Sequence, residues 1–135
     1  MPKNKRLIVD TNLWISFLLT KNLSALDSLF KANQITLLFS QELLDEFVDV
    51  TSRPKFKKYF SSEDLQALIS SIKEHAEFIF VNSEVNECRD SKDNFLLSLA
   101  KDGNASHLIT GDKDLLELKK FGKTNILTYT EFIKN

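Results

Sequence analysis

Apolar positions along the chain follow two alternating patterns. Short apolar runs bounded by polar residues lie at 6–10, 34–39, 77–81, 107–110 and 125–128, which is typical of buried strands. Between these runs, apolar residues recur every three or four positions, which predicts helices at about 12–19, 24–32, 41–51, 62–75, 92–102 and 113–120. Strands that alternate with helices indicate a parallel sheet covered on both faces. We therefore expect an α/β fold, a three-layer α/β/α sandwich whose central, mostly parallel sheet has about five strands.

The helix boundaries are marked by residues that cap or break helices. Pro54 ends the helix before it, because the residue preceding a proline is driven out of the helical region. Gly103 and Gly122 are expected to close the helices over 92–102 and 113–120, since glycine is favoured just after a helix. The expected N-caps are Ser24, Ser40, Ser61 and, for a final turn, Thr130.

Composition narrows the class of protein. The chain has 135 residues, of which 42% are hydrophobic, so we expect one compact domain over 1–135. The single cysteine, Cys88, excludes an intramolecular disulfide, and two histidines are too few for most structural zinc sites. The longest apolar run, 13–19, is too short for a membrane span, and the first residues do not resemble a signal peptide. We expect a soluble, cytoplasmic protein.

Charge is nearly balanced overall but unevenly placed. The formal net charge is −1, which by itself gives no reason to expect a nucleic-acid partner. If a metal site neutralised four acids, however, the remaining surface would carry +3, so a polyanionic substrate is not excluded. Four cations are concentrated within six residues: Arg53, Lys55, Lys57 and Lys58.

Acidic residues follow the predicted strands. Asp10 ends the first strand, Asp112 lies two residues after the fourth, and Asp90 and Asp93 open a helix after the third. Ligands of open α/β sheets bind beyond the carboxyl ends of the strands, so these acids are expected near one edge. Each of them also has a simpler interpretation, as a helix cap or an Asx-turn. Clustered carboxylates repel one another unless a cation is present, and oxygen ligands alone suit Mg²⁺ or Mn²⁺.

A fifth acid is ambiguous. In the helix over 41–51, Leu43 and Phe47 lie on the apolar face. Asp45 and Glu46 border that face on opposite sides, so periodicity does not distinguish which of them points toward the site.

Taken together, these segments resemble PIN-domain ribonucleases, and the similarity extends from residue 6 to about residue 128. The resemblance is strongest to the branch described as toxin components of toxin–antitoxin systems. The matching segments, in order, are Leu7–Asn12, Ser40–Glu46 with Arg53–Phe56 downstream, Cys88–Asn94 and Leu108–Leu115.

The resemblance implies a metal-dependent endoribonuclease that leaves a 5′-phosphate and a 3′-hydroxyl. Its catalytic and metal-binding acids would be Asp10, Glu46, Asp93 and Asp112, holding Mg²⁺ or Mn²⁺, so the resemblance favours Glu46 over Asp45. Supporting or alternative ligands would be Asn12, Asp90, Thr110 and Asp114. It also implies an RNA substrate, a cognate antitoxin protein and a homodimer.

Two further features of the sequence each allow two interpretations. The cations Arg53, Lys55, Lys57 and Lys58, interleaved with Phe56, Tyr59 and Phe60, form either an RNA contact or a lysine-covered turn whose aromatic rings pack into the core. Trp14 is expected in the core or at a dimer face.

Three other functions compete with the nuclease. Phosphatases of the haloacid dehalogenase type need an acid two residues after the strand-end aspartate, where this chain has Asn12. A phosphorylatable receiver domain needs an aspartate at the end of the third strand, where this chain has Asn82. A PIN fold that serves only as a protein-binding scaffold has the same sequence features as the enzyme.

Overall fold

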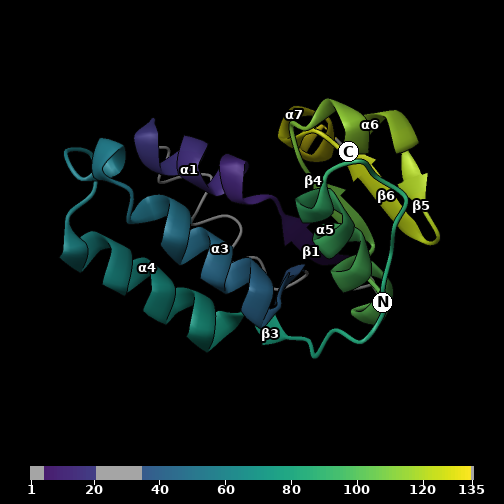
Figure 1. Cartoon of the computed structure of the whole chain (residues 1–135), viewed down its shortest axis with the longest axis horizontal. Helices are drawn as coiled ribbons and strands as arrows, with labels where there is room; N and C mark the ends of the chain where they lie inside the picture. Colours follow the sequence, from purple (N-terminus) through teal and green to yellow (C-terminus); the bar gives the residue numbers. More distant parts are fainter. Residues whose placement is uncertain (1–4, 21–34, 135) are drawn as a thin grey trace.

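A computed structural model describes residues 5–20 and 35–134. Their sheet has the order β3-β2-β1-β4-β6-β5, and every neighbouring pair is parallel except β5 and β6 (Figure 1). The strands are β1 (Lys5–Val9), β2 (Ile35–Phe39), β3 (Glu77–Phe78), β4 (His107–Ile109), β5 (Lys120–Phe121) and β6 (Thr124–Leu127). The helix predicted at 24–32, with its cap Ser24, lies outside the described residues.

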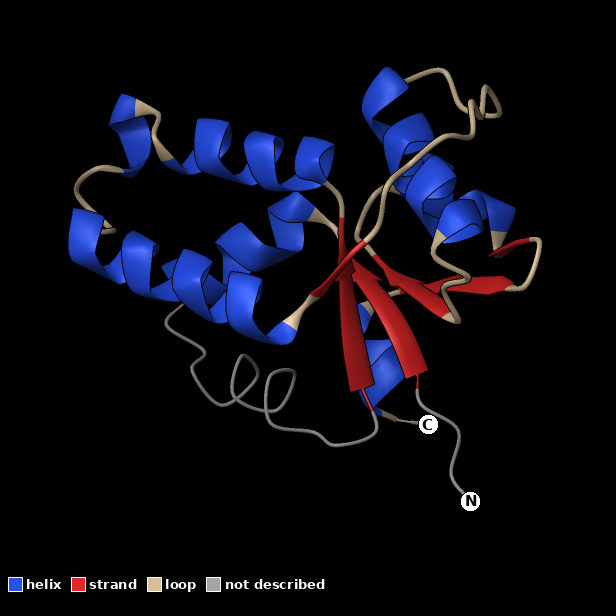
Figure 2. Ribbon diagram, turned by 90° about the horizontal axis from the view of Figure 1, so that it is seen from below, coloured by secondary structure: helices blue, strands red, loops and turns tan. Residues whose placement is uncertain are grey.

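Helices lie on both sides of this sheet, which confirms the expected α/β fold (Figure 2). Helices α1, α3 and α4 extend together to one side of the molecule, whereas α5, α6 and α7 lie around the other end of the sheet (Figure 1). None of the described helices is long and apolar enough to cross a membrane. The helices are α1 (Thr11–Leu19), α3 (Gln41–Thr51), α4 (Ser62–His75), α5 (Ser91–Asp102), α6 (Lys113–Leu118) and α7 (Tyr129–Ile133), with a 3₁₀ turn at Pro54–Phe56.

The core is centred on β1 and its neighbours. Ile8 is fully buried in the middle of the sheet, as expected for a parallel strand covered on both faces. Trp14 of α1 is also fully buried, and its ring lies 6.1 Å from that of Phe39 and 6.5 Å from that of Phe47. Trp14 is therefore a core residue, the first of its two predicted roles, and it joins α1 to β2 and α3.

Two strand predictions were wrong. The third strand was expected over 77–81, but β3 contains only Glu77 and Phe78. Its neighbour β2 ends at Phe39, so residues beyond Ile79 have no strand with which to pair. The antiparallel strand β5 was not predicted at all, because its two residues are too few to show a period.

The chain around β5 also differs from the expected helix over 113–120. Helix α6 ends at Leu118, because Lys119 has a positive φ of 60° that no helix interior accepts. Gly122, expected to close that helix, has a φ of 59° and instead makes the turn between β5 and β6. The last helix is capped by Thr128 rather than Thr130, since Thr128 forms a capping box with Glu131.

Gly103 closes α5 as predicted, and close packing adds a second reason for a glycine there. It is the C-cap of α5 with a φ of −90°, and the positive φ that often follows a helix, 52°, belongs to Asn104. A Cβ at Gly103 would lie 3.0 Å from Leu38 Cδ1 and 3.0 Å from the Leu99 carbonyl oxygen. The position therefore requires glycine because α5 and β2 approach each other closely there.

Gly103→Ala is expected to lower the free energy of unfolding by about 1–3 kcal/mol, because the added methyl group forces α5 away from β2. Urea denaturation of the two proteins measures this difference. Gly111→Ala is the matched control, since a Cβ there has no heavy atom within 4 Å. Equal losses in the two variants would show that close packing at Gly103 is not the cause.

Candidate active site

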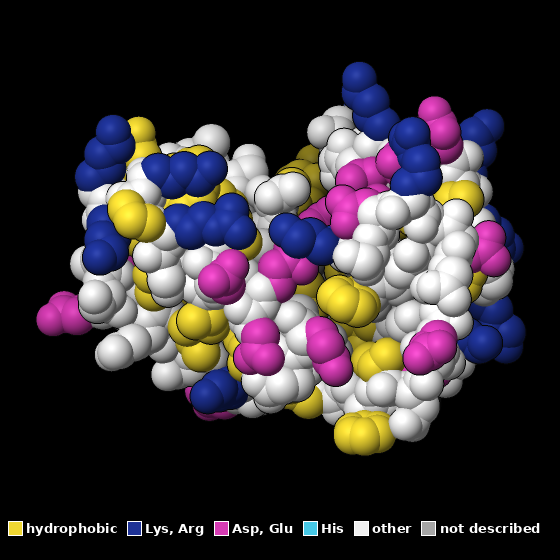
Figure 3. All heavy atoms as spheres, in the orientation of Figure 1, with side chains coloured by type: hydrophobic (Ala, Val, Ile, Leu, Met, Phe, Trp, Pro, Cys, Tyr) yellow, Lys and Arg dark blue, Asp and Glu magenta, His cyan; other side chains and the backbone are white. Residues whose placement is uncertain are grey.

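A pocket of about 240 Å³ collects acidic side chains from the whole length of the chain. It opens where the surface is hollowed between the part formed by α1 and α3 and the part formed by α5 and α6, and Asp and Glu side chains gather there (Figure 3). Its carboxylates belong to Asp10, Glu46, Asp90, Asp93 and Asp112. All four acids of the predicted quartet thus line one pocket, together with the predicted Asn12 and Asp90.

Asp10 is held by the ends of two neighbouring strands. It follows β1 directly, and its backbone N–H donates to the carbonyl oxygen of Ile109 in β4 at 3.0 Å. Its Oδ1 accepts from the Asn12 N–H at 3.3 Å, and its Oδ2 accepts from Thr110 Oγ1 at 2.8 Å. Burial raises the pKa of Asp10, and the hydrogen bond from Thr110 opposes that rise. Thr110 therefore helps to orient the carboxylate of Asp10.

Asp112 is held by the beginning of α6. Its backbone N–H donates to Thr110 Oγ1 at 3.0 Å, so a single hydroxyl group connects Asp10 and Asp112. Its Oδ1 accepts from the N–H groups of Asp114 at 2.8 Å and Leu115 at 3.2 Å, as an N-cap does. The orientation of this carboxylate is thus fixed by backbone groups.

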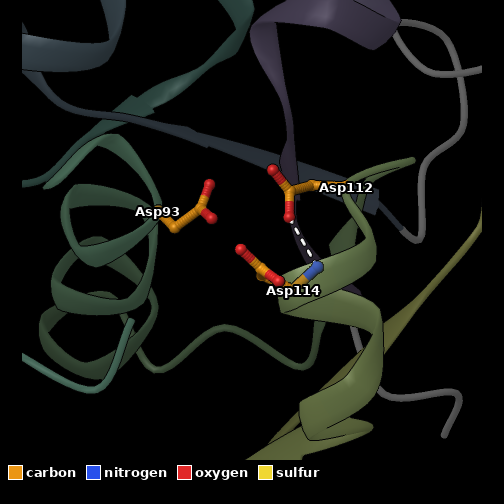
Figure 4. Close-up of side chains that lie close together, drawn as sticks. All are labelled: Asp93, Asp112 and Asp114. Atoms are coloured by element: carbon orange, nitrogen blue, oxygen red, sulfur yellow. Dashed lines mark hydrogen bonds between the residues drawn. The ribbon is translucent and has the colours of Figure 1, made fainter. Parts of the chain in front are cut away.

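Asp93, Asp112 and Asp114 converge from two helices. One carboxylate oxygen of each lies within 4.8 Å of the others, and Asp93 of α5 faces the pair on α6 across a gap (Figure 4). Asp114 is not part of the pocket wall described above, and its carboxylate accepts hydrogen bonds from Arg89 Nη2 at 3.1 and 3.2 Å. The position of Asp114 is therefore compatible with the predicted supporting role, although its carboxylate also forms an ion pair with Arg89.

Asp93 is the most perturbed acid of the site. It is only 4% exposed, and its buried Oδ2 accepts no hydrogen bond from any described residue. Burial and the negative charges of Asp112, Asp90 and Asp10 together raise the pKa of Asp93 to about 6. A buried carboxylate oxygen without a donor, among other carboxylates, fits a bound divalent cation.

Glu46 and Asp45 are clearly separated by the structure. Glu46 is half-buried and lines the pocket, whereas Asp45 is exposed and accepts a hydrogen bond from Gln41 Nε2 at 2.8 Å. Burial raises the pKa of Glu46, the positive charge of Lys92 lowers it, and the negative charge of Asp10 raises it. Of the two neighbours, Glu46 is the one that faces the other acids.

The cap interpretation is correct for three of the acids and wrong for Asp93, which is the third residue of α5. Asp10, Asp90 and Asp112 are the N-caps of α1, α5 and α6 respectively. In each case the cap hydrogen bonds use Oδ1, which leaves Oδ2 outside the cap. Capping and a role in the pocket are therefore compatible in the same side chain.

The four clustered cations, Arg53, Lys55, Lys57 and Lys58, are divided between the pocket and the outer surface. Arg53 and Lys55 line the acidic pocket, whereas Lys57 and Lys58 do not. Of the aromatic residues interleaved with them, Phe60 is buried but Tyr59 is 52% exposed. The prediction of rings packed into the core is therefore correct for Phe60 and wrong for Tyr59.

Two residues of the site were missed by the sequence analysis. Lys92 lines the pocket next to the acids, and Arg89 forms an ion pair with Asp114. Both lie in the segment between Cys88 and Asn94 that carries the resemblance, so their positions beside Asp90 and Asp93 were the available signal.

Comparisons with known proteins agree with this geometry. A family profile described as PIN domain matches residues 6–114. The chain is 31% identical over 122 residues to an uncharacterized protein of Methanocaldococcus jannaschii, covering 87% of this chain and 77% of that protein. No solved structure gives a significant match.

Proposed function

Because the chain belongs to the PIN domain family, whose members typically are metal-dependent nucleases, we propose that it hydrolyses RNA phosphodiester bonds with Mg²⁺ or Mn²⁺. We also propose, from the resemblance of its motifs, that it is the toxin of a toxin–antitoxin pair, acts in the cytoplasm as a homodimer and is restrained by a cognate antitoxin. The observation that supports the nuclease best is the single pocket shared by Asp10, Glu46, Asp93 and Asp112.

Asp10, Asp93 and Asp112 are the residues that would hold the cation. Their oxygens come from a strand end and two helix beginnings, and those of Asp10 and Asp112 are fixed by the hydrogen bonds of Thr110 and of the cap. A divalent cation held there supplies neutralisation of the phosphodiester and lowers the pKa of a water molecule. Rigid ligands matter because they keep this geometry during the reaction.

Glu46 is placed to accept the proton of the attacking water. Its pKa is raised by burial, which makes its carboxylate a better proton acceptor near neutral pH. Attack of water on phosphorus with cleavage of the P–O3′ bond yields a 5′-phosphate and a 3′-hydroxyl. Lys92, across the pocket, adds positive charge where the phosphodiester enters.

The test is cleavage of a mixed pool of structured and single-stranded RNA in Mg²⁺, Mn²⁺ or EDTA. We expect cleavage in the two metals but not in EDTA. Glu46→Gln is expected to lower the cleavage rate about a hundredfold, because the amide cannot accept the proton.

Asp45→Asn is the matched control, since Asp45 is the next residue of the same helix but points away from the pocket. Its cleavage rate should equal that of the wild type. Equal losses in Glu46→Gln and Asp45→Asn would contradict the assigned role of Glu46. Absence of cleavage together with absence of metal uptake in calorimetry would instead favour the protein-binding scaffold.

A further inference from the structure

A second surface pocket adjoins the acidic one and has the opposite charge. We call it the basic aromatic patch, and its residues are Leu19, Lys55, Phe56, Lys58 and Tyr59. Lys55 and Phe56 line both pockets, so the patch is continuous with the site of the acids. Lys and Arg side chains cover this end of the molecule, beside the hollow in which the acids gather (Figure 3).

The rings and cations of the patch are arranged in pairs. Lys55 Nζ lies 5.1 Å from the centroid of the Phe56 ring, and Lys58 Nζ lies 5.2 Å from that of Tyr59. Phe56 in turn stacks on the buried Phe60 at 5.8 Å, which fixes its ring against the core. Tyr59 has no such cover and is 52% exposed.

The lysines of the patch are not neutralised by acids. Among the described residues, neither Lys55 nor Lys58 has a carboxylate partner, whereas the neighbouring Arg53 pairs with Asp49 at 3.4 Å. Two uncompensated ammonium groups next to an exposed ring form a surface that attracts an anion with a flat, apolar face. A nucleotide has both properties, because its phosphate is negative and its base stacks on aromatic rings.

We propose that the basic aromatic patch binds the single-stranded RNA that flanks the scissile bond, with an unpaired base stacked on Tyr59 and phosphates beside Lys55 and Lys58. This inference rests on the proposed nuclease function. It makes Tyr59 a residue that selects unpaired over paired substrate, since the faces of bases in a duplex are already stacked on their neighbours.

The distribution of charge around the acidic pocket supports this role for the patch. The pocket of the acids repels an approaching polyanion, so binding energy for the strand must come from its surroundings. Arg53 and Lys55 line the acidic pocket, and Lys55 also lines the basic aromatic patch. Lys58 lines the patch alone, farther from the acids. A strand that enters the pocket along these cations passes over Tyr59.

The test measures RNA binding separately from cleavage. A labelled single-stranded RNA of mixed sequence, about ten nucleotides long, is titrated with the full chain in the Glu46→Gln background, and fluorescence anisotropy reports binding. The same strand annealed to its complement is the second probe. We expect Tyr59→Ala to weaken binding of the single strand about tenfold, and Tyr59→Trp to restore it. Lys58→Gln should reduce the slope of log K against log salt concentration by about 0.7.

Phe80→Ala is the matched control, because Phe80 is 84% exposed but follows α4 and β3, whereas Tyr59 precedes α4. Equal affinities of Tyr59→Ala and Phe80→Ala for the single strand would overturn the proposal, as would equal binding of the duplex and the single strand. Tyr59-dependent binding of an acidic peptide but not of RNA would also overturn it.

The experiments distinguish an error in the proposed role of the patch from an error in the proposed nuclease activity. Cleavage by the wild type with unchanged binding in Tyr59→Ala overturns the patch alone. Tyr59-dependent binding of the single strand without any cleavage supports the patch as an RNA site and overturns the proposed nuclease.

Discussion

Asp93→Asn is expected to lower RNA cleavage about a thousandfold and, at the same time, to make the metal-free protein more stable at neutral pH. Activity is expected to fall because the amide would replace a proposed, negatively charged metal ligand, and loss of such a ligand removes several kcal/mol of transition-state stabilisation. Asp93 Oδ2 is buried and accepts no hydrogen bond from any described residue, so it is free to bind a cation.

Stability is expected to move in the opposite direction because of the raised pKa of Asp93. Burial and the neighbouring carboxylates raise the pKa of Asp93 to about 6 from a model-peptide value of 3.8. The folded protein therefore holds this proton more tightly than the unfolded chain does, and the stability that this provides is lost as the pH rises through about 6. The loss at neutral pH is about 3 kcal/mol, and a neutral asparagine avoids it.

Urea denaturation in EDTA at about pH 5 and about pH 8 measures this effect as a difference between variant and wild type. The difference is needed because His107, whose pKa is lowered by burial and by the charge of Lys5, makes the wild-type protein more stable as the pH rises through this range, which is the opposite sense. Asp64→Asn is the matched control, since Asp64 occupies the same third position of α4 that Asp93 occupies in α5, but is exposed.

Greater stability of Asp64→Asn than of Asp93→Asn at neutral pH would contradict the argument from burial. Wild-type cleavage by Asp93→Asn would contradict its role as a ligand.

Metal binding is expected to depend steeply on pH. At about pH 8, Mg²⁺ or Mn²⁺ at a hundred times its dissociation constant adds about 2.7 kcal/mol to the stability, which raises the melting temperature by about 10 °C. At about pH 5 this rise should be about half as large, because Asp93, with its pKa raised to about 6, must lose its proton before it can bind a cation. Cleavage should decline about tenfold per pH unit below the same pKa.

The direction of this pH dependence is the same for all three acids of the pocket whose pKa values are raised. The pKa values of Asp10 and Glu46 are also raised by burial, so acid disfavours the metal-binding form of each. Differential scanning fluorimetry with and without the metal, at the two pH values, gives the shift directly. Asp93→Asn should show little shift at either pH, and a wild-type shift as large at pH 5 as at pH 8 would contradict the prediction.

The acids of the site could be predicted because strand ends and helix beginnings are both visible in the sequence. Asp10 follows an apolar run, and Asp112 follows another, so the geometry of a parallel sheet brings them to one edge. Whether Asp45 or Glu46 joins them depends on how α3 is rotated against the core. Periodicity identifies the apolar face of α3 but does not show which of the two flanking acids points toward the site. The resemblance favoured Glu46, and the packing of α3 places Glu46 in the pocket.

Features that depend on a few residues in tertiary contact could not be predicted. The hairpin of β5 and β6 depends on the positive φ values of Lys119 and Gly122, and a lysine gives no sign of such a conformation. Likewise, Gly103 closes α5 as predicted, but its close approach to Leu38 could not be predicted, because that is a contact across the fold. The pairing of Arg89 with Asp114 belongs to the same class.

The order of the strands has a consequence for the stage of synthesis at which the acidic pocket can be completed. β4 lies between β1 and β6, yet it is synthesised after α5 and brings Thr110 and Asp112 with it. A nascent chain that has emerged only as far as α5 contains Asp10, Glu46 and Asp93, and β2 beside β1, but it lacks β4 on the other side of β1 and the Asp112 that follows β4. If the chain is the nuclease proposed above, the ribosome that produces it is not exposed to a complete site until β4 and the residues that follow it have been translated.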